Sequence, residues 1–207
     1  MIAVLIGEGS TDRALVAPLN WVLREATPVQ SEVRWVDACR LPRKHTLADR
    51  VGAVRQIESF DLLFIHRDAD SGPPDDRRAE IADAAGDVRH VPVIPVRMTE
   101  SWLLPHEEAI REACGRPSGR EPLNLPALKR IEALADPKAA LRAAIQATMN
   151  VRPGRRSRQD PTDAFYRISD RVEDWSVLRA PSAFRRLEAD TRAALASLGL
   201  PVNADAG

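Results

Sequence analysis

The chain has 207 residues, of which 44% are hydrophobic, and this is enough for one sizeable domain with a packed core. Its 30 acidic and 30 basic side chains balance, so the net charge neither indicates nor excludes nucleic acid as a ligand. The widely separated Cys39 and Cys114 argue against a disulfide scaffold or a zinc site, and the absence of a leader or a long apolar run predicts a soluble cytoplasmic protein without membrane contact.

Strand and helix patterns alternate through the first hundred residues. Apolar segments predict four strands, at 2–6, 33–36, 61–66 and 91–96. The run at 61–66 is typical of a central parallel strand, whereas two prolines place the strand at 91–96 nearer an edge. The alternation predicts an α/β fold with a parallel sheet.

Amphipathic spacing predicts the helices between these strands, at about 10–24, 46–57 and 75–85. Ser10 or Thr11 is expected to cap the first helix, and Thr46 the second. The second helix should bury one apolar face, formed by Leu47, Val51, Val54 and Ile57.

The strand signals stop after residue 100. Helical segments are expected at 100–114, 125–134, 138–149 and 182–198, and the segment 150–161 is expected to form a basic loop. We therefore expect an α/β core at 1–100 and a helical carboxyl-terminal extension at 101–207 that packs on it.

Acidic residues follow three of the predicted strands. Glu8 follows the first, Asp68 and Asp70 the third, and Glu100 the fourth. Because the carboxyl ends of parallel strands meet at one edge of a sheet, we expect these four carboxylates to gather there. Carboxylates at close range repel, and a hard cation such as Mg²⁺ or Mn²⁺ relieves that repulsion. The pattern predicts a metal site in which Glu8 ligates the ion or acts as a general base.

Each acid taken alone also has a simpler interpretation. Glu8 and Glu100 precede helices, where acids stabilise the helix dipole. Asp68 and Asp70 precede a Ser-Gly-Pro-Pro turn, in which aspartate is common. The coincidence of acids at three strand ends is what favours a functional site.

The sequences "EGSTD" after the first strand and "DAD" after the third resemble the Toprim domain, which topoisomerases, primases and nucleases of the OLD type share. This resemblance covers about the first 100 residues and implies a Rossmann-like, mostly parallel sheet of about four strands flanked by helices. It implies Glu8 as general acid/base or metal ligand and Asp68 and Asp70 as Mg²⁺ ligands, and Glu100 matches the further acids of OLD-type nucleases. The blocks "IPVRMTESWLL" and "DPKAAL" also make the whole chain resemble a group of small uncharacterised bacterial proteins. The family resemblance further suggests a defence or toxin-like system.

Basic residues supply candidate contacts to substrate phosphate. The densest basic cluster consists of Arg152, Arg155, Arg156 and Arg158. Arg97 lies near the acids in the sequence, and Lys138 lies at the start of a predicted helix. Arginine suits bidentate phosphate contact, although a solvated surface loop explains the cluster slightly better. No P-loop sequence occurs in the chain, so any use of ATP would require a separate ATPase partner.

Three functions are compatible with these patterns. The leading hypothesis is metal-dependent phosphodiester hydrolysis of DNA or RNA by Glu8, Asp68, Asp70 and Glu100. The second is an enzyme acting on a small phosphoester or nucleotide. The third is a non-catalytic module of the same fold that recruits a partner, in which case the acids need not bind metal.

Overall fold

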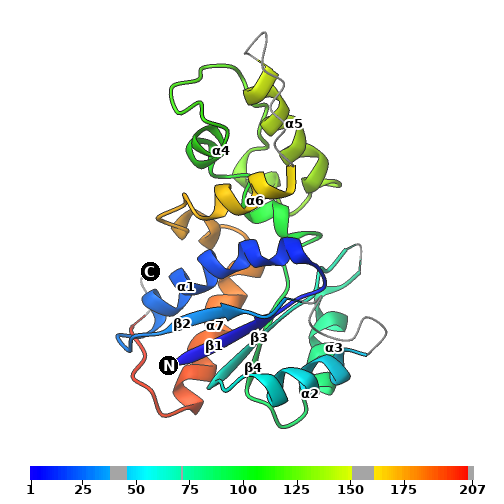
Figure 1. Cartoon of the computed structure of the whole chain (residues 1–207), viewed down its shortest axis with the longest axis vertical. Coiled ribbons are helices and arrows are strands. Elements are labelled where there is room, and N and C mark those ends of the chain that lie inside the picture. Colours follow the sequence, from blue (N-terminus) through cyan, green and yellow to red (C-terminus); the bar gives the residue numbers. More distant parts are fainter. Residues whose placement is uncertain (38–45, 71, 151–160, 205–207) are drawn as a thin grey trace.

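The computed structural model describes residues 1–37, 46–70, 72–150 and 161–204 of the chain (Figure 1). Its four strands are β1 (Ile2–Ile6), β2 (Glu32–Trp35), β3 (Leu62–His66) and β4 (His90–Val93). They form one all-parallel sheet in the order β2-β1-β3-β4. The predicted α/β fold is confirmed, with β3 inside the sheet and the proline-containing β4 at its edge.

The apolar residues of β1 and β3 alternate between two cores. Ala3, Leu5 and Phe64 face one core, and Val4 and Ile65 face the other. Both strands are buried on both faces, which explains why their sequences are continuous apolar runs.

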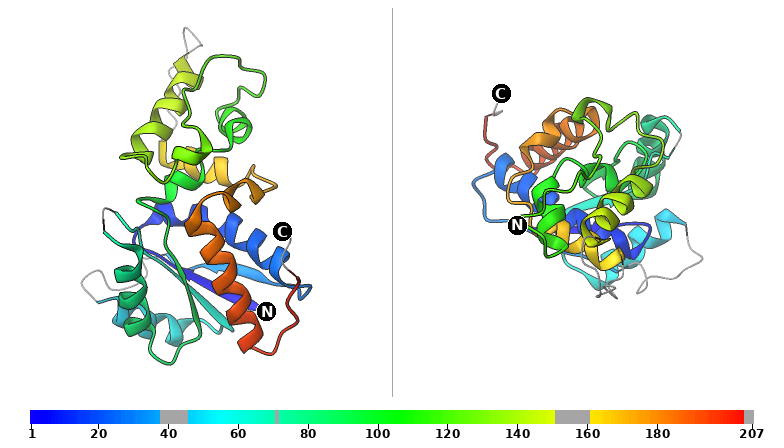
Figure 2. Two further views of the ribbon diagram at one scale, coloured as in Figure 1. Left: turned by 180° about the vertical axis from the view of Figure 1, so that it is seen from behind. Right: turned by 90° about the horizontal axis from the view of Figure 1, so that it is seen from above.

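Two helices cover each face of the sheet (Figures 1 and 2). α1 (Val16–Ala26) and α7 (Ser182–Ser197) pack against one another on one face, and α7 also packs on β4. α2 (Leu47–Ile57) and α3 (Pro74–Ala85) pack against one another on the opposite face. The last helix therefore belongs to the sheet layer, although it follows the rest of the helical extension in the sequence.

The remaining helices form a separate layer at the top of Figure 1. They are α4 (Glu107–Ala113), α5 (Pro137–Asn150) and α6 (Pro161–Ser169). α6 packs on a 3₁₀ helix, Ser10–Leu15, that follows β1, and α5 packs on another, Thr99–Trp102, that follows β4. The helical layer consequently stands over the carboxyl end of the sheet. Further 3₁₀ helices are Leu128–Arg130 and Ser176–Arg179.

Several local predictions are wrong in detail. Neither Ser10 nor Thr11 caps α1, because the chain first forms the 3₁₀ helix that begins after Gly9. Ile57 is exposed at the last turn of α2, although the Thr46 cap is confirmed by its bond from the Asp49 N–H. The segment 100–114 is not one helix, since turns around Pro105 separate a 3₁₀ helix from α4.

Two further observations concern the extension. α6 was not predicted, and it follows the basic segment 151–160, which lies outside the described residues. Among the residues that are described, no helix combines the length and the apolar character that crossing a bilayer would require.

Candidate active site

The carboxyl end of the sheet brings acids from three chain segments together. Glu8 lies two residues after β1, Asp68 two residues after β3, and Glu100 in the 3₁₀ helix after β4. Parallel pairing of β1 with β3 and of β3 with β4 aligns these three ends. The gathering of Glu8, Asp68 and Glu100 therefore follows from the strand order.

A fourth acid, Asp12, holds the loop that carries Glu8. Its Oδ2 accepts hydrogen bonds from the backbone N–H groups of Glu8 at 2.7 Å and of Gly9 at 3.0 Å. The carboxylate also packs against Gly7, where an added Cβ would lie 2.8 Å from the Asp12 Cβ and closer still to Oδ2. Asp12 is buried, so the two N–H groups bind its carboxylate in place of water.

His66, the last residue of β3, lies fully buried beneath the acids. Its Nδ1 is 3.0 Å from the Val93 carbonyl oxygen, which can only accept, so Nδ1 carries a proton. Its Nε2 faces three oxygens, Thr99 Oγ1 at 3.2 Å, Asp68 Oδ1 at 3.4 Å and Asp12 Oδ1 at 3.6 Å. The imidazole thus lies within 3.6 Å of both Asp12, which follows β1, and Asp68, which follows β3.

Asp68 is the centre of this arrangement. Its side chain is only 24% exposed, and its Oδ1 accepts the Thr99 N–H at 3.2 Å. Burial raises the pKa of the Asp68 carboxyl to about 7 against the opposing effect of His66, and the carboxylates of Asp12, Glu8 and Glu100 raise it further. The carboxylates of Asp12, Glu8 and Glu100 therefore lie near enough to oppose the ionisation of Asp68, although burial is the larger cause.

The loops after β3 and β4 are joined beyond the last strand residues. Backbone N–H groups of Arg67, Ala69 and Asp70 donate to carbonyl oxygens of residues 93, 95 and 97 at 3.1 to 3.4 Å. Asp70 and Arg97 both have left-handed backbones, with φ of 52° and 68°. Such conformations cost free energy outside glycine and gather at functional sites. The Asp68–Asp70 loop is accordingly held in a defined, strained shape.

The structure turns Asp70 away from the other acids. Its Oδ2 lies 3.4 Å from Arg77 Nη2 of α3, and it is not among the groups that shift the pKa of Asp68. Glu8 also meets a basic partner, with its Oε1 2.9 Å from Arg67 Nε. Both arginines bind the same residue, Glu80, at 3.1 Å and 2.9 Å.

The predicted phosphate contacts differ in position. Lys138, in the first turn of α5, lies 3.9 Å from Glu100 Oε1 and therefore faces the site. Arg97 is half-buried and lies in the loop after β4, where its carbonyl accepts the Asp70 N–H. Arg152, Arg155, Arg156 and Arg158 lie outside the described residues.

The helical layer fixes the first acidic loop from above. The Tyr166 hydroxyl of α6 donates to the Ser10 carbonyl at 2.5 Å, and the Ser169 hydroxyl donates to the Ala14 carbonyl. The Arg13 guanidinium lies 5.7 Å from the centre of the Tyr166 ring. α6 thus connects the carboxyl-terminal half of the chain to the site.

The ligand chemistry of the site suits a hard cation, since the facing groups are carboxylate oxygens. Within the described residues, however, no three His, Cys, Asp or Glu side chains are already grouped closely enough to hold a metal ion. The reason is visible in the ion pairs, because Arg67 holds Glu8, Arg77 holds Asp70 and Lys138 faces Glu100. Cation binding would require Glu8 and Glu100 to turn from these partners toward Asp68, and Asp70 would have to leave Arg77 to join them.

Sequence reasoning did not assign roles to Asp12 and Thr99. Asp12 stands four residues after Glu8 in "EGSTD", and Thr99 directly precedes Glu100, so their positions were the available signal. Comparison with family models, curated proteins and solved structures found no match to this chain.

Proposed function

We propose that this chain is a Toprim-type, divalent-cation-dependent phosphodiesterase that hydrolyses DNA or RNA. One observation carries the proposal: acids that follow β1 and β4 lie near enough to Asp68, which follows β3, to oppose its ionisation at the carboxyl edge of a parallel sheet. Ligands of open α/β sheets bind at this edge, and a cluster of carboxylates without a cation is unfavourable.

The residues have distinct roles in this proposal. Asp68, Glu8 and Glu100 would hold Mg²⁺ or Mn²⁺, with Asp70 as a further candidate ligand. The bound ion would polarise a phosphoryl oxygen and favour deprotonation of water. Asp12 keeps the Glu8 loop in place through two backbone N–H groups, and the Thr99 N–H orients Asp68. Lys138, which faces Glu100, would contact substrate phosphate, and Arg97, whose carbonyl accepts the Asp70 N–H, is a second candidate for such a contact.

Asp68→Asn tests the proposal, because it keeps the side-chain shape and removes the charge. Purified protein is incubated with single- and double-stranded DNA and RNA in Mg²⁺, in Mn²⁺ and in chelator. We expect cleavage that requires the cation and falls at least about a hundredfold in the variant, more than outer-shell residues of a metal site usually cost.

The matched control is Asp87→Asn, at the opposite end of the sheet, which should cleave like the wild type. Equal cleavage by Asp68→Asn, or cleavage in chelator, would contradict the proposal. Hydrolysis of p-nitrophenyl phosphate without activity on polynucleotides would instead assign the site to a small phosphoester.

A second candidate is a non-catalytic binding module. It is favoured by the ion pairs of Glu8 with Arg67 and of Asp70 with Arg77, which neutralise two acids without any cation. This candidate predicts no cleavage under any of these conditions and no effect of Mg²⁺ on the thermal stability of the protein.

A further inference from the structure

Two arginines beside the acids share one glutamate. Glu80 of α3 places Oε1 3.1 Å from Arg67 Nη2 and Oε2 2.9 Å from Arg77 Nη1. At its other end each guanidinium meets an acid of the candidate site, Glu8 for Arg67 and Asp70 for Arg77. Five side chains from three segments therefore alternate in charge across the mouth of the site.

Both arginines are attached to the loop that carries Asp68. Arg67 precedes Asp68 in the chain, and Arg77 Nε donates to the Asp68 carbonyl at 3.2 Å. The two guanidiniums are partly exposed and thus accessible to a ligand in solution. Both arginines therefore adjoin the loop on which Asp68 would meet a phosphate.

The outer ion pairs are poorly made. Arg67 Nε is buried and lies 2.9 Å from Glu8 Oε1, yet its N–H makes no hydrogen bond. The distance from Arg77 to Asp70 is 3.4 Å, and the side chains of Glu8 and Asp70 are 39% and 58% exposed. Exposed ion pairs contribute little stability, so these two carboxylates can leave at small cost. The contacts to Glu80 would remain and keep the guanidiniums in place.

We propose that Arg67 and Arg77 form a phosphate-binding pair for the nucleic-acid substrate, exchanging Glu8 and Asp70 for phosphate oxygens when a divalent cation engages the acids. The proposal rests on the proposed function, because the cation is what removes the carboxylates. Arginine suits this exchange, since its planar group of donors binds carboxylate and phosphate in the same geometry. Without the cation, the arginines stay paired and contribute little to binding.

The test measures binding separately from cleavage. Fluorescence anisotropy with labelled single-stranded DNA and RNA oligonucleotides is recorded over a salt series, in Ca²⁺ and in chelator. The variants are Arg67→Gln and Arg77→Gln. The control is Arg55→Gln, which removes an arginine that is also paired with an acid but lies at the opposite end of the sheet.

In Ca²⁺, each site variant should bind about tenfold more weakly than the wild type, as expected for loss of a charge-assisted hydrogen bond. Each should also lower the salt slope by about one, because one phosphate contact is lost. In chelator each should stay within about twofold of the wild type, a difference too small to represent a lost contact of that kind. A merely structural role would weaken binding equally in both conditions, and Arg55→Gln should change neither.

Wild-type affinity of both variants in Ca²⁺, or equal losses in Ca²⁺ and chelator, would overturn the proposal. If the wild type cleaves with a cation and Asp68→Asn does not, such a result overturns the arginine pair alone. If the wild type neither cleaves nor binds more tightly in Ca²⁺, the proposed function and the arginine pair both fail.

Discussion

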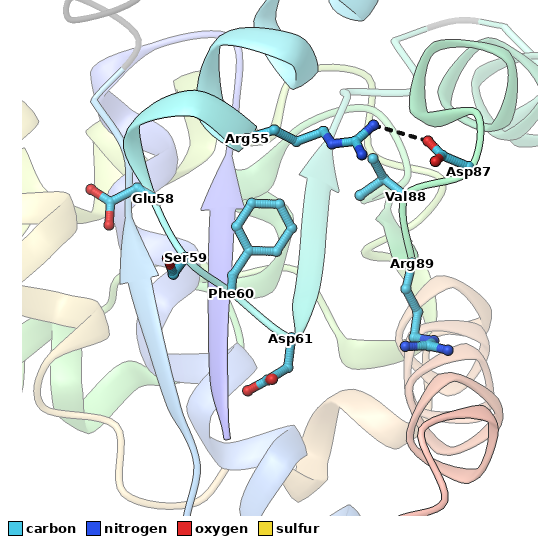
Figure 3. A pocket seen from close by; sticks show the side chains of 8 residues that line it. All are labelled: Arg55, Glu58, Ser59, Phe60, Asp61, Asp87, Val88 and Arg89. Atoms are coloured by element: carbon cyan, nitrogen blue, oxygen red, sulfur yellow. Dashed lines mark hydrogen bonds and ion pairs between the residues drawn. The ribbon is translucent and has the colours of Figure 1, made fainter.

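The two ends of the sheet contain the same kinds of residues in different environments. The amino end has a depression of about 600 Å³ lined by charged and apolar side chains from two loops and the end of α2 (Figure 3). Arg55 and Asp87 form a 2.9 Å ion pair across it, with side chains 53% and 81% exposed. At the carboxyl end, Asp12, His66 and Glu100 are buried.

The backbone differs between the two ends as well. Asp70 and Arg97, at the carboxyl end, have left-handed conformations, whereas in the amino-end loop between α3 and β4 the residue with a left-handed φ is a glycine, Gly86. Solvated ion pairs and glycine turns need no function to explain them. Buried acids and strained loops lower stability, and they persist where the site requires them. Burial, rather than residue type, therefore distinguishes the candidate site.

The largest expected effect concerns Asp68 and pH. Its pKa of about 7 in the folded chain exceeds the ordinary value of 3.8, so the folded state holds this proton more tightly than the unfolded state. The stability that protonated Asp68 contributes is present below pH ~4 and is lost as pH rises through about 7. In urea denaturation, the free energy of unfolding of Asp68→Asn should rise relative to that of the wild type by about 4 kcal/mol between pH ~4 and ~8.

The same titration of Asp87→Asn should run parallel to the wild type, because Asp87 is solvated. Addition of Mg²⁺ should reduce the gain of Asp68→Asn, since the cation stabilises the ionised carboxylate. The difference in the free energy of unfolding between Asp68→Asn and the wild type could instead stay constant from acid to neutral pH. That result would show that Asp68 is as solvated as the acids at the amino end.

A smaller effect is expected from removing the buried anchor Asp12. Asp12→Ala leaves the Glu8 and Gly9 N–H groups without their acceptor and should cost about 2 kcal/mol in the free energy of unfolding. The corresponding change at the amino end, Asp87→Ala, should stay within about 0.5 kcal/mol. Both variants are measured by urea denaturation. Equal losses in the free energy of unfolding would show that the burial of Asp12 adds nothing to its contribution to stability.

The smallest effect compares two glycines. Gly7→Ala places a methyl group against the Asp12 side chain and should cost about 1 to 2 kcal/mol through overpacking. Gly52→Ala, inside α2, meets no atom within 4 Å and should raise stability by about 0.5 kcal/mol, because alanine favours the helix. Thermal unfolding of both variants measures the contrast, and a harmless Gly7→Ala would mean that the Asp12 loop can shift freely.

The sequence was sufficient to predict the sheet, because β1 and β3 are buried on both faces and read as continuous apolar runs. The predicted sheet also placed Glu8, Asp68 and Glu100 at one edge, because parallel strands end at the same edge of a sheet. α6 was not predicted, because it is short and follows a basic segment. Its apolar face consists of only three buried residues, Ala164, Phe165 and Ile168.

The remaining features of the site depend on geometry that a sequence does not contain. Asp12 binds backbone N–H groups, which every residue carries, so no side-chain pattern marks it. Asp70 has a left-handed backbone and pairs with Arg77, although its spacing from Asp68 suggests a shared ligand. His66 is both buried and in contact with Asp68, and its place at the end of an apolar strand does not by itself reveal that contact.

The central claim is that the carboxyl end of the sheet binds a divalent cation through Asp68. Isothermal titration calorimetry of Mn²⁺ and Mg²⁺ into the wild type, Asp68→Asn and Asp87→Asn tests it without any substrate. The account predicts saturable binding by the wild type and by Asp87→Asn, and loss of that binding in Asp68→Asn. No binding by the wild type, or undiminished binding by Asp68→Asn, would contradict it.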